Sequence, residues 1–106
     1  MALLSSSLIG MNIRKARMNK SAEIGFGYTK KMLADDLNEN VHIVNVLESG
    51  RFYPDYEHLQ KISKICGVTM EFLVGEEFEG ADDYYKAIHE ATKDNACSIT
   101  RENKRY

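Results

Sequence analysis

The sequence contains little of what membrane, secreted and metal-binding proteins need. Its 106 residues include one proline and two cysteines, and no apolar run approaches the roughly 18 residues that cross a bilayer. Cys66 and Cys97 are too few for a disulfide framework and lack metal-site spacing. Residues 1–10 lack the positive charge that opens a secretory signal, so we expect them to lead into a helix. A reducing cytoplasm is the expected compartment.

Groupings typical of enzymes are also missing. No Ser-His-Asp or paired-carboxylate arrangement stands out, and no His, Cys, Asp or Glu cluster has zinc spacing. Gly25-Phe26-Gly27 lacks the lysine pattern of a phosphate-binding loop. We therefore expect a protein without enzymatic activity, cofactor or metal.

What the sequence does contain is an uneven distribution of charge. Its net charge of −2 argues against a protein that coats nucleic acid indiscriminately. Residues 1–54 carry seven Lys/Arg against five Asp/Glu, whereas residues 55–106 carry seven against eleven. A basic first half and an acidic second half fit a domain that presents one face to an anion.

The stretch over residues 29–54 predicts two short helices joined by a tight turn. Thr29 can cap the first helix, whose apolar residues fall on one face. Asn38-Glu39-Asn40 favours a turn, and a second helix can follow as far as Glu48, where Ser49-Gly50 offers a C-terminal cap. Helices this short are unstable alone, so they must pack against other helices of the chain.

Further helices are expected on both sides of this pair, over residues 8–20, 55–66, 70–74 and 82–94. Two glycines in four residues predict a loop over 21–28, with Ile24, Phe26 and Tyr28 tucked beneath it. Phe72 and Leu73 are the expected core anchors of the fifth helix. The sequence thus predicts an all-α, five-helix domain over residues 8–75. An acidic C-terminal extension follows over 76–106, with one helix and a frayed tail.

A characteristic set of residues runs through this domain, from Ile9 to Val74. It comprises Ile13, Arg14, Arg17, Leu33, Ala34, Leu37, Val44, Leu47, Glu48, Ser49, Gly50, Pro54, Leu59, Ile62, Gly67, Val68, Phe72 and Leu73. This set resembles the Cro/repressor-type helix-turn-helix family, often called XRE-type regulators. The fourteen-residue interval from Ala34 to Glu48 matches the family's spacing. The small Ala34 lets the two central helices cross closely.

The resemblance implies that the helix from about Asn40 to Ser49 enters the major groove of DNA. Matching positions give the expected base readers, Val41, His42, Asn45 and Val46, and the expected phosphate contacts, Thr29, Lys30 and Arg51. Helical phase supports the same face, because Val44 and Leu47 point away from His42 and Asn45. The resemblance also suggests an ion pair between Arg17 and Glu48, the alternative being two separate surface charges.

With His42 and Asn45 as its polar readers, this face is expected to read bases weakly or to lean toward A·T pairs. Val41, Ile43 and Val46 stand where the family more often has polar residues, and apolar side chains contact thymine methyl groups. The expected function is transcriptional regulation, as a repressor of bacterial or phage type that binds double-stranded DNA as a homodimer. The alternative is a protein-interaction module of the same fold, antitoxin-like or an anti-repressor, which holds a protein partner through the groove face or residues 79–106.

Overall fold

The computed structural model describes residues 4–76 and 78–92, and every regular element in that part of the chain is a helix. Chain contacts define two compact units. One spans Ser5–Glu77 and contains α1 (Ser6–Ile24), α2 (Lys30–Leu37), α3 (Val41–Ser49), α4 (Tyr56–Cys66) and α5 (Met70–Val74). The other contains Leu4 and α6 (Ala81–Thr92). The predicted all-α fold is confirmed, whereas the domain division predicted after residue 75 stays a prediction.

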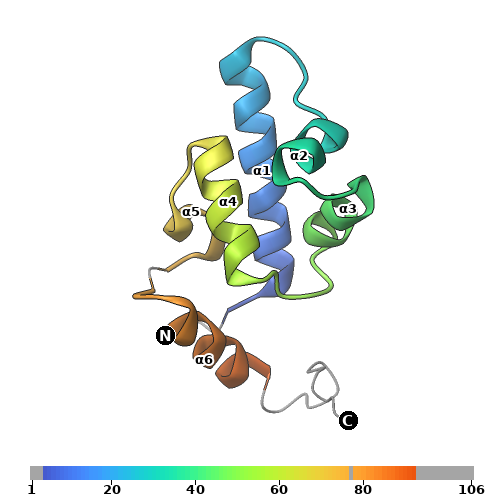
Figure 1. Ribbon diagram of the computed structural model, residues 1–106. Coiled ribbons are helices and arrows are strands. Elements are labelled where there is room, and N and C mark those ends of the chain that lie inside the picture. The colour runs from blue at the N-terminus through green and yellow to red at the C-terminus, as the bar shows by residue number, and fades with distance from the viewer. Residues whose placement is uncertain (1–3, 77, 93–106) are drawn as a thin grey trace. The chain divides into compact units, whose positions relative to one another are not determined.

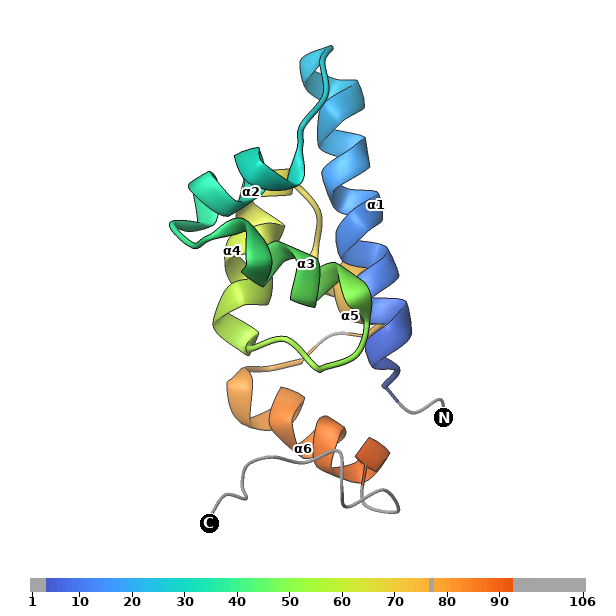
Figure 2. The ribbon, with the colours of Figure 1, turned by 90° about the vertical axis from the view of Figure 1, so that its right-hand side faces the viewer.

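In the first unit, α1 is the long central helix. Helices α2 and α3 lie on one side of it and α4 and α5 on the other (Figure 1). The side chains between them form one apolar core: Ile9, Ile13, Ala16, Leu33, Ala34, Leu37, Val44, Leu47, Leu59, Ile62 and Leu73 are all buried. Figure 2 views the same unit from the side of α2 and α3, where both short helices face the reader. The core therefore supports α3 from behind and leaves its outer side open.

Short polar side chains cap the N-terminal ends of four of these helices. The side-chain oxygens of Ser5, Thr29, Asn40 and Thr69 each accept a hydrogen bond from a backbone N–H in the first turn, at 2.9–3.2 Å. These bonds satisfy donors that have no partner inside the helix. The predicted caps at Thr29 and Thr69 are confirmed.

The first helix is longer than predicted. It starts at Ser6 and continues to Ile24, so the expected bounds of residues 8–20 and the expected loop over 21–28 are wrong. Residues 21–24 are compatible with helix, and only Gly25, whose φ of 84° lies in the left-handed region, ends it. The hydroxyl of Ser21 accepts a hydrogen bond from the backbone N–H of Tyr28 at 2.6 Å, which ties the shortened loop to the helix.

Two aromatic side chains lie differently from prediction. Tyr28 is buried as expected, but Phe26 is 61% exposed between two glycines and is not tucked beneath the loop. In α5, Leu73 is buried, whereas Phe72 is 37% exposed and is not a core anchor. Only one side of a single-turn helix can face the core, and in α5 that side carries Leu73.

The second unit contains the helix α6. This helix starts at Ala81, close to the predicted start at residue 82, and Asp82 and Asp83 lie in its first turn. Acidic side chains at this end are favoured by the helix dipole. The aromatic ring of Tyr84 makes edge contacts with Phe78 and Tyr85, at centroid distances of 5.7 and 5.2 Å. The predicted helical residues 93–94 and the predicted frayed tail lie outside the described residues.

Helix α1 and the end of α3 approach each other through two glycines. A β-carbon added to Gly10 would lie 2.8 Å from the backbone of Gly50, and one added to Gly50 would lie 2.9 Å from Ser7. The Ser6 hydroxyl also donates to the Gly50 carbonyl oxygen at 2.8 Å. This contact sets the distance between α1 and the C-terminus of α3.

Gly10→Ala is therefore expected to destabilise the protein, although alanine favours a helix over glycine by about 1 kcal/mol. The added carbon would press on backbone that cannot rotate away, and overpacking of this kind typically costs about 1–3 kcal/mol. Gly27→Ala is the matched control, because no heavy atom lies within 4 Å of its added carbon. Urea unfolding curves compare the two variants. Equal or higher stability of Gly10→Ala would contradict the close approach.

Candidate nucleic-acid interface

Helix α3 has one buried side and one exposed side. Val44 and Leu47 point into the core, whereas Val41, His42 and Asn45 are exposed and Val46 is half-buried. The four residues predicted as base readers thus lie on or beside the outer face of α3. The structure therefore places these four residues together on one helix.

The turn before α3 holds that helix against α2. Asn38 adopts the left-handed conformation with a φ of 60°, and its N–H bonds to the carbonyl oxygen of Asp35 at 3.0 Å. The N–H of Glu39 bonds to the carbonyl oxygen of Ala34 at 2.9 Å, and Asn40 then caps α3. Asparagine tolerates this backbone region better than most residues. The two helices therefore meet through a hydrogen-bonded turn, and Ala34, whose carbonyl oxygen accepts one of these bonds, is buried.

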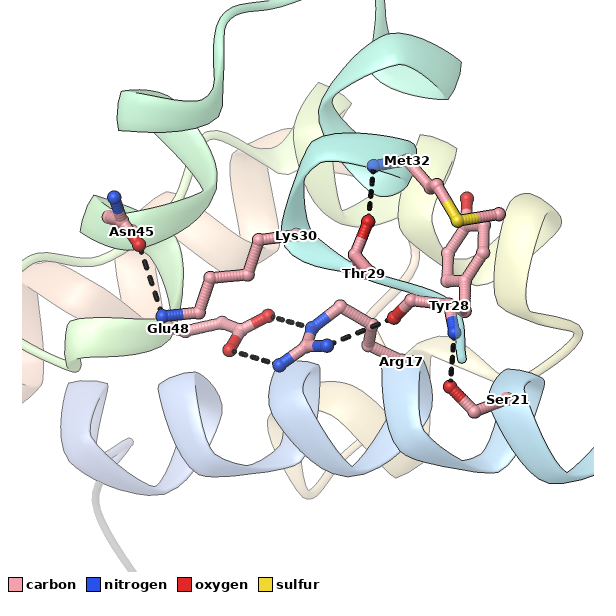
Figure 3. A network of polar contacts seen from close by, with 8 residues as sticks. All are labelled: Arg17, Ser21, Tyr28, Thr29, Lys30, Met32, Asn45 and Glu48. Carbon is pink, nitrogen blue, oxygen red and sulfur yellow. Dashed lines mark hydrogen bonds and ion pairs between the residues drawn. The ribbon is translucent and has the colours of Figure 1, made fainter. Parts of the chain in front are cut away.

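A buried ion pair ties α1 to the end of α3. Arg17 donates from Nε to Glu48 Oε2 at 2.7 Å and from Nη2 to Glu48 Oε1 at 3.2 Å, while Nη1 donates to the carbonyl oxygen of Tyr28 at 3.0 Å (Figure 3). The two side chains are only 11% and 5% exposed. Arginine and glutamate form this two-bond fork because their planar groups match in shape. The structure therefore places these residues as a pair and not as separate surface charges.

Tyr28 joins the same network to α2. Its hydroxyl donates to Asp36, and burial together with this hydrogen bond raises the pKa of the Tyr28 phenol above its ordinary value. Lys20 lies over the Tyr28 ring at 5.2 Å and donates to the carbonyl oxygen of Ile65 at 3.0 Å. Lys20 thus contacts the protein itself.

The predicted phosphate contacts lie at the start of α2 and just after the end of α3. Thr29 caps α2 by accepting from the Met32 N–H at 3.1 Å, which leaves its hydroxyl hydrogen free to donate. Lys30 reaches from the start of α2 to Asn45, with 3.1 Å between Nζ and Oδ1. Arg51 is exposed just after Gly50. The N-terminal end of α2 adds a partial positive charge beside Thr29 and Lys30.

One cationic residue of this surface was not predicted. Arg14, on α1, lines a polar cleft of about 380 Å³ together with Arg17, Lys30, Asn45, Glu48 and Ser49. Arg14 makes no ion pair with any of the described residues. A signal was available in the sequence, since Arg14 precedes Arg17 by three residues and so lies on a similar side of the helix.

Comparison with known proteins agrees with this geometry. Residues 24–73 match the family described as helix-turn-helix. The matched segment contains a helix-turn-helix motif of this family. The resemblance predicted from the sequence is therefore confirmed, with α2 and α3 as the two helices of the motif.

Two individual proteins are similar to this chain. A segment of 62 residues is 36% identical to a Yarrowia lipolytica protein that carries the name multi-protein-binding factor 1. The segment is 58% of this chain but only 37% of that relative, so the chain spans little more than a third of its length. A solved transcriptional regulator from Listeria innocua has the same fold, with a TM-score of 0.52 and 19% identity over 95% of this chain and 84% of the other.

Within residues 4–76 and 78–92, no three His, Cys, Asp or Glu side chains lie together as a metal site. None of the helices in those residues is long and apolar enough to pass through a membrane.

Proposed function

We propose that this protein is a transcriptional regulator that binds double-stranded DNA in a sequence-specific manner, with α3 in the major groove. One observation carries the proposal. Val44 and Leu47 anchor α3 in the core, so that Val41, His42, Asn45 and the half-buried Val46 lie on or beside its outer face. An α-helix fits the major groove, where base pairs differ in their donors and acceptors. The helix-turn-helix family match supports the same placement.

The phosphate contacts in this proposal are Thr29, Lys30 and Arg51, with Arg14 added from the polar cleft. These residues place positive charges and a hydroxyl donor near α3, although the whole chain has a net charge of −2. Phosphate contacts orient a protein on the duplex, and base contacts select the sequence. A repressor that acts by covering a promoter needs both.

The simplest regulator of this kind is a cytoplasmic homodimer. Helix-turn-helix dimers bind two half-sites about 34 Å apart, one helical turn of DNA. Two copies of α3 would then enter successive major grooves on one side of the duplex.

Salt dependence tests the phosphate contacts. DNA selected from a random pool by the wild-type protein should bind with an affinity that falls as salt rises. Lys30→Ala and Arg51→Ala should each reduce the slope of log K against log salt by about 1, and Arg51→Ala should weaken all sequences about equally. Lys64→Ala, an exposed charge on α4, removes the same charge and should leave the slope unchanged. DNA affinity and a salt slope that neither substitution changes would contradict the assignment of Lys30 and Arg51 as phosphate contacts.

A second function, the binding of a partner protein, is favoured by an apolar surface on α1 and α5. Met11, Met18 and Phe72 line an apolar groove of about 400 Å³ between α1 and α5, with Arg14 and Lys15 beside it. Such a groove fits an amphipathic helix with acidic residues on its edges. The Yarrowia relative, by its name, binds several proteins. Failure to enrich any DNA sequence, together with a folded chain, would favour this second function.

A further inference from the structure

One hydrogen bond joins the two helices of the motif on their outer side. Lys30, at the start of α2, donates from Nζ to Oδ1 of Asn45, in the middle of α3, at 3.1 Å. Both side chains are exposed, and the bond lies outside the apolar core. In Figure 3 the Asn45 oxygen turns toward Lys30 and its nitrogen turns away. A residue proposed for phosphate contact is thus bonded to a residue proposed for base reading.

The chemistry of the two groups determines which end of the amide faces the lysine. An ammonium group has only donors, whereas the asparagine carboxamide has an acceptor oxygen and a donor nitrogen. The oxygen must therefore face Lys30, and the NH₂ group is the end left for a base. Asparagine recognises adenine by using both ends, with the oxygen accepting from N6 and the nitrogen donating to N7. The bond to Lys30 uses one of the two acceptor positions of the Asn45 oxygen and turns that oxygen toward α2, so two-bond recognition of adenine would need the same oxygen to accept a second hydrogen bond.

The remaining donor suits a guanine. Guanine presents two acceptors, N7 and O6, in the major groove, whereas adenine presents one acceptor and one amino donor. A positive charge beside Asn45 attracts the guanine acceptors and repels the adenine amino hydrogens. We infer that Lys30, by holding the Asn45 oxygen, turns Asn45 into a reader of a G·C pair. This inference rests on the proposed function, and at this residue it departs from the A·T preference expected from the sequence for the face as a whole.

Selection of bound DNA from a random pool provides the test. Asn45→Ala first identifies the base pair that Asn45 reads, as the position whose preference disappears. At that position the wild type should select G·C. Lys30→Met keeps a long apolar side chain but frees the Asn45 oxygen, so the ratio of G·C to A·T should fall by about tenfold, the size expected for one good side-chain contact to a base.

Two control variants separate this role from a general loss of charge. Lys31→Met removes the neighbouring lysine, which pairs with Asp35 on α2 at 2.8 Å, and should leave the base ratio unchanged. Lys30→Arg keeps a group that can only donate and should retain the G·C preference.

The outcomes distinguish this inference from the proposed function. Uniform weakening by Lys30→Met, with an unchanged base ratio, would leave Lys30 as a phosphate contact and overturn the inference alone. A wild-type preference for A·T at the Asn45 position would also overturn it. No enrichment of any sequence by the folded wild type would overturn both the proposed function and this inference.

Discussion

Replacement of Glu48 by alanine is expected to lower the free energy of unfolding by about 3–5 kcal/mol. The guanidinium of Arg17 makes two hydrogen bonds to Glu48, at 2.7 and 3.2 Å, and its side chain is only 11% exposed. Without the carboxylate, the positive charge stays buried, and among the described residues the Tyr28 carbonyl oxygen is its one remaining acceptor. A domain of this size has a total stability of about 5–15 kcal/mol, so the loss is a large part of the whole.

Urea unfolding followed by circular dichroism measures this loss. Glu57→Ala is the matched control, because Glu57 pairs with Lys61 at 3.9 Å but is 79% exposed, and such surface pairs contribute about 0–1 kcal/mol. The double variant Arg17→Met with Glu48→Leu should recover much of the lost stability, since it leaves no unpaired charge. An unfolding midpoint of Glu48→Ala equal to that of the wild type would contradict a buried, energetically coupled pair.

Val46→Glu is expected to reduce DNA affinity by about 100-fold or more, with little change in stability. Val46 is half-buried beside the exposed Asn45 of α3, so a glutamate there can keep its charge in water in the free protein. On DNA the same carboxylate would meet acceptor atoms and phosphates, and like charges brought together at an interface cost several kcal/mol. Each 1.4 kcal/mol corresponds to about tenfold in affinity.

The control for this variant carries the same added charge elsewhere. Gln60→Glu lies on the exposed side of α4 and changes the net charge equally. It should bind selected DNA almost as the wild type does, apart from a small salt-dependent loss. Similar losses in both variants would indicate that net charge, and not contact with α3, governs binding. Wild-type affinity of Val46→Glu would place α3 outside the interface.

Local signals in the sequence predicted the helices well where caps were strong. Thr29 and Thr69 cap the second and fifth helices as expected, and Gly50 follows α3 in the left-handed conformation. The predicted end of α1, at residue 20, was four residues too early, because the glycines at 25 and 27 were taken to exclude helix from all of residues 21–28. Residues 21–24 contain nothing that breaks a helix, and the break comes only at Gly25.

The exposure of aromatic residues could not be predicted in the same way. Periodicity shows that Phe72 and Leu73 cannot both point inward from a helix as short as α5, but it does not show which one does. The position of α5 against α1 decides this, through contacts such as the Asn12 side chain, which donates to the Leu73 carbonyl oxygen at 3.2 Å. Phe26 shows the same limit, because its surroundings depend on where the long α1 ends.

The sequence by itself determined the helical class, the central turn and the family, because caps, apolar spacing and turn residues act between neighbours in the chain. Only the tertiary structure decided that Gly10 meets Gly50, that Arg14 shares a cleft with Lys30, and that Lys30 holds Asn45. These contacts join different helices. Their distances depend on how the helices pack and cross, which the order of residues along one helix does not specify.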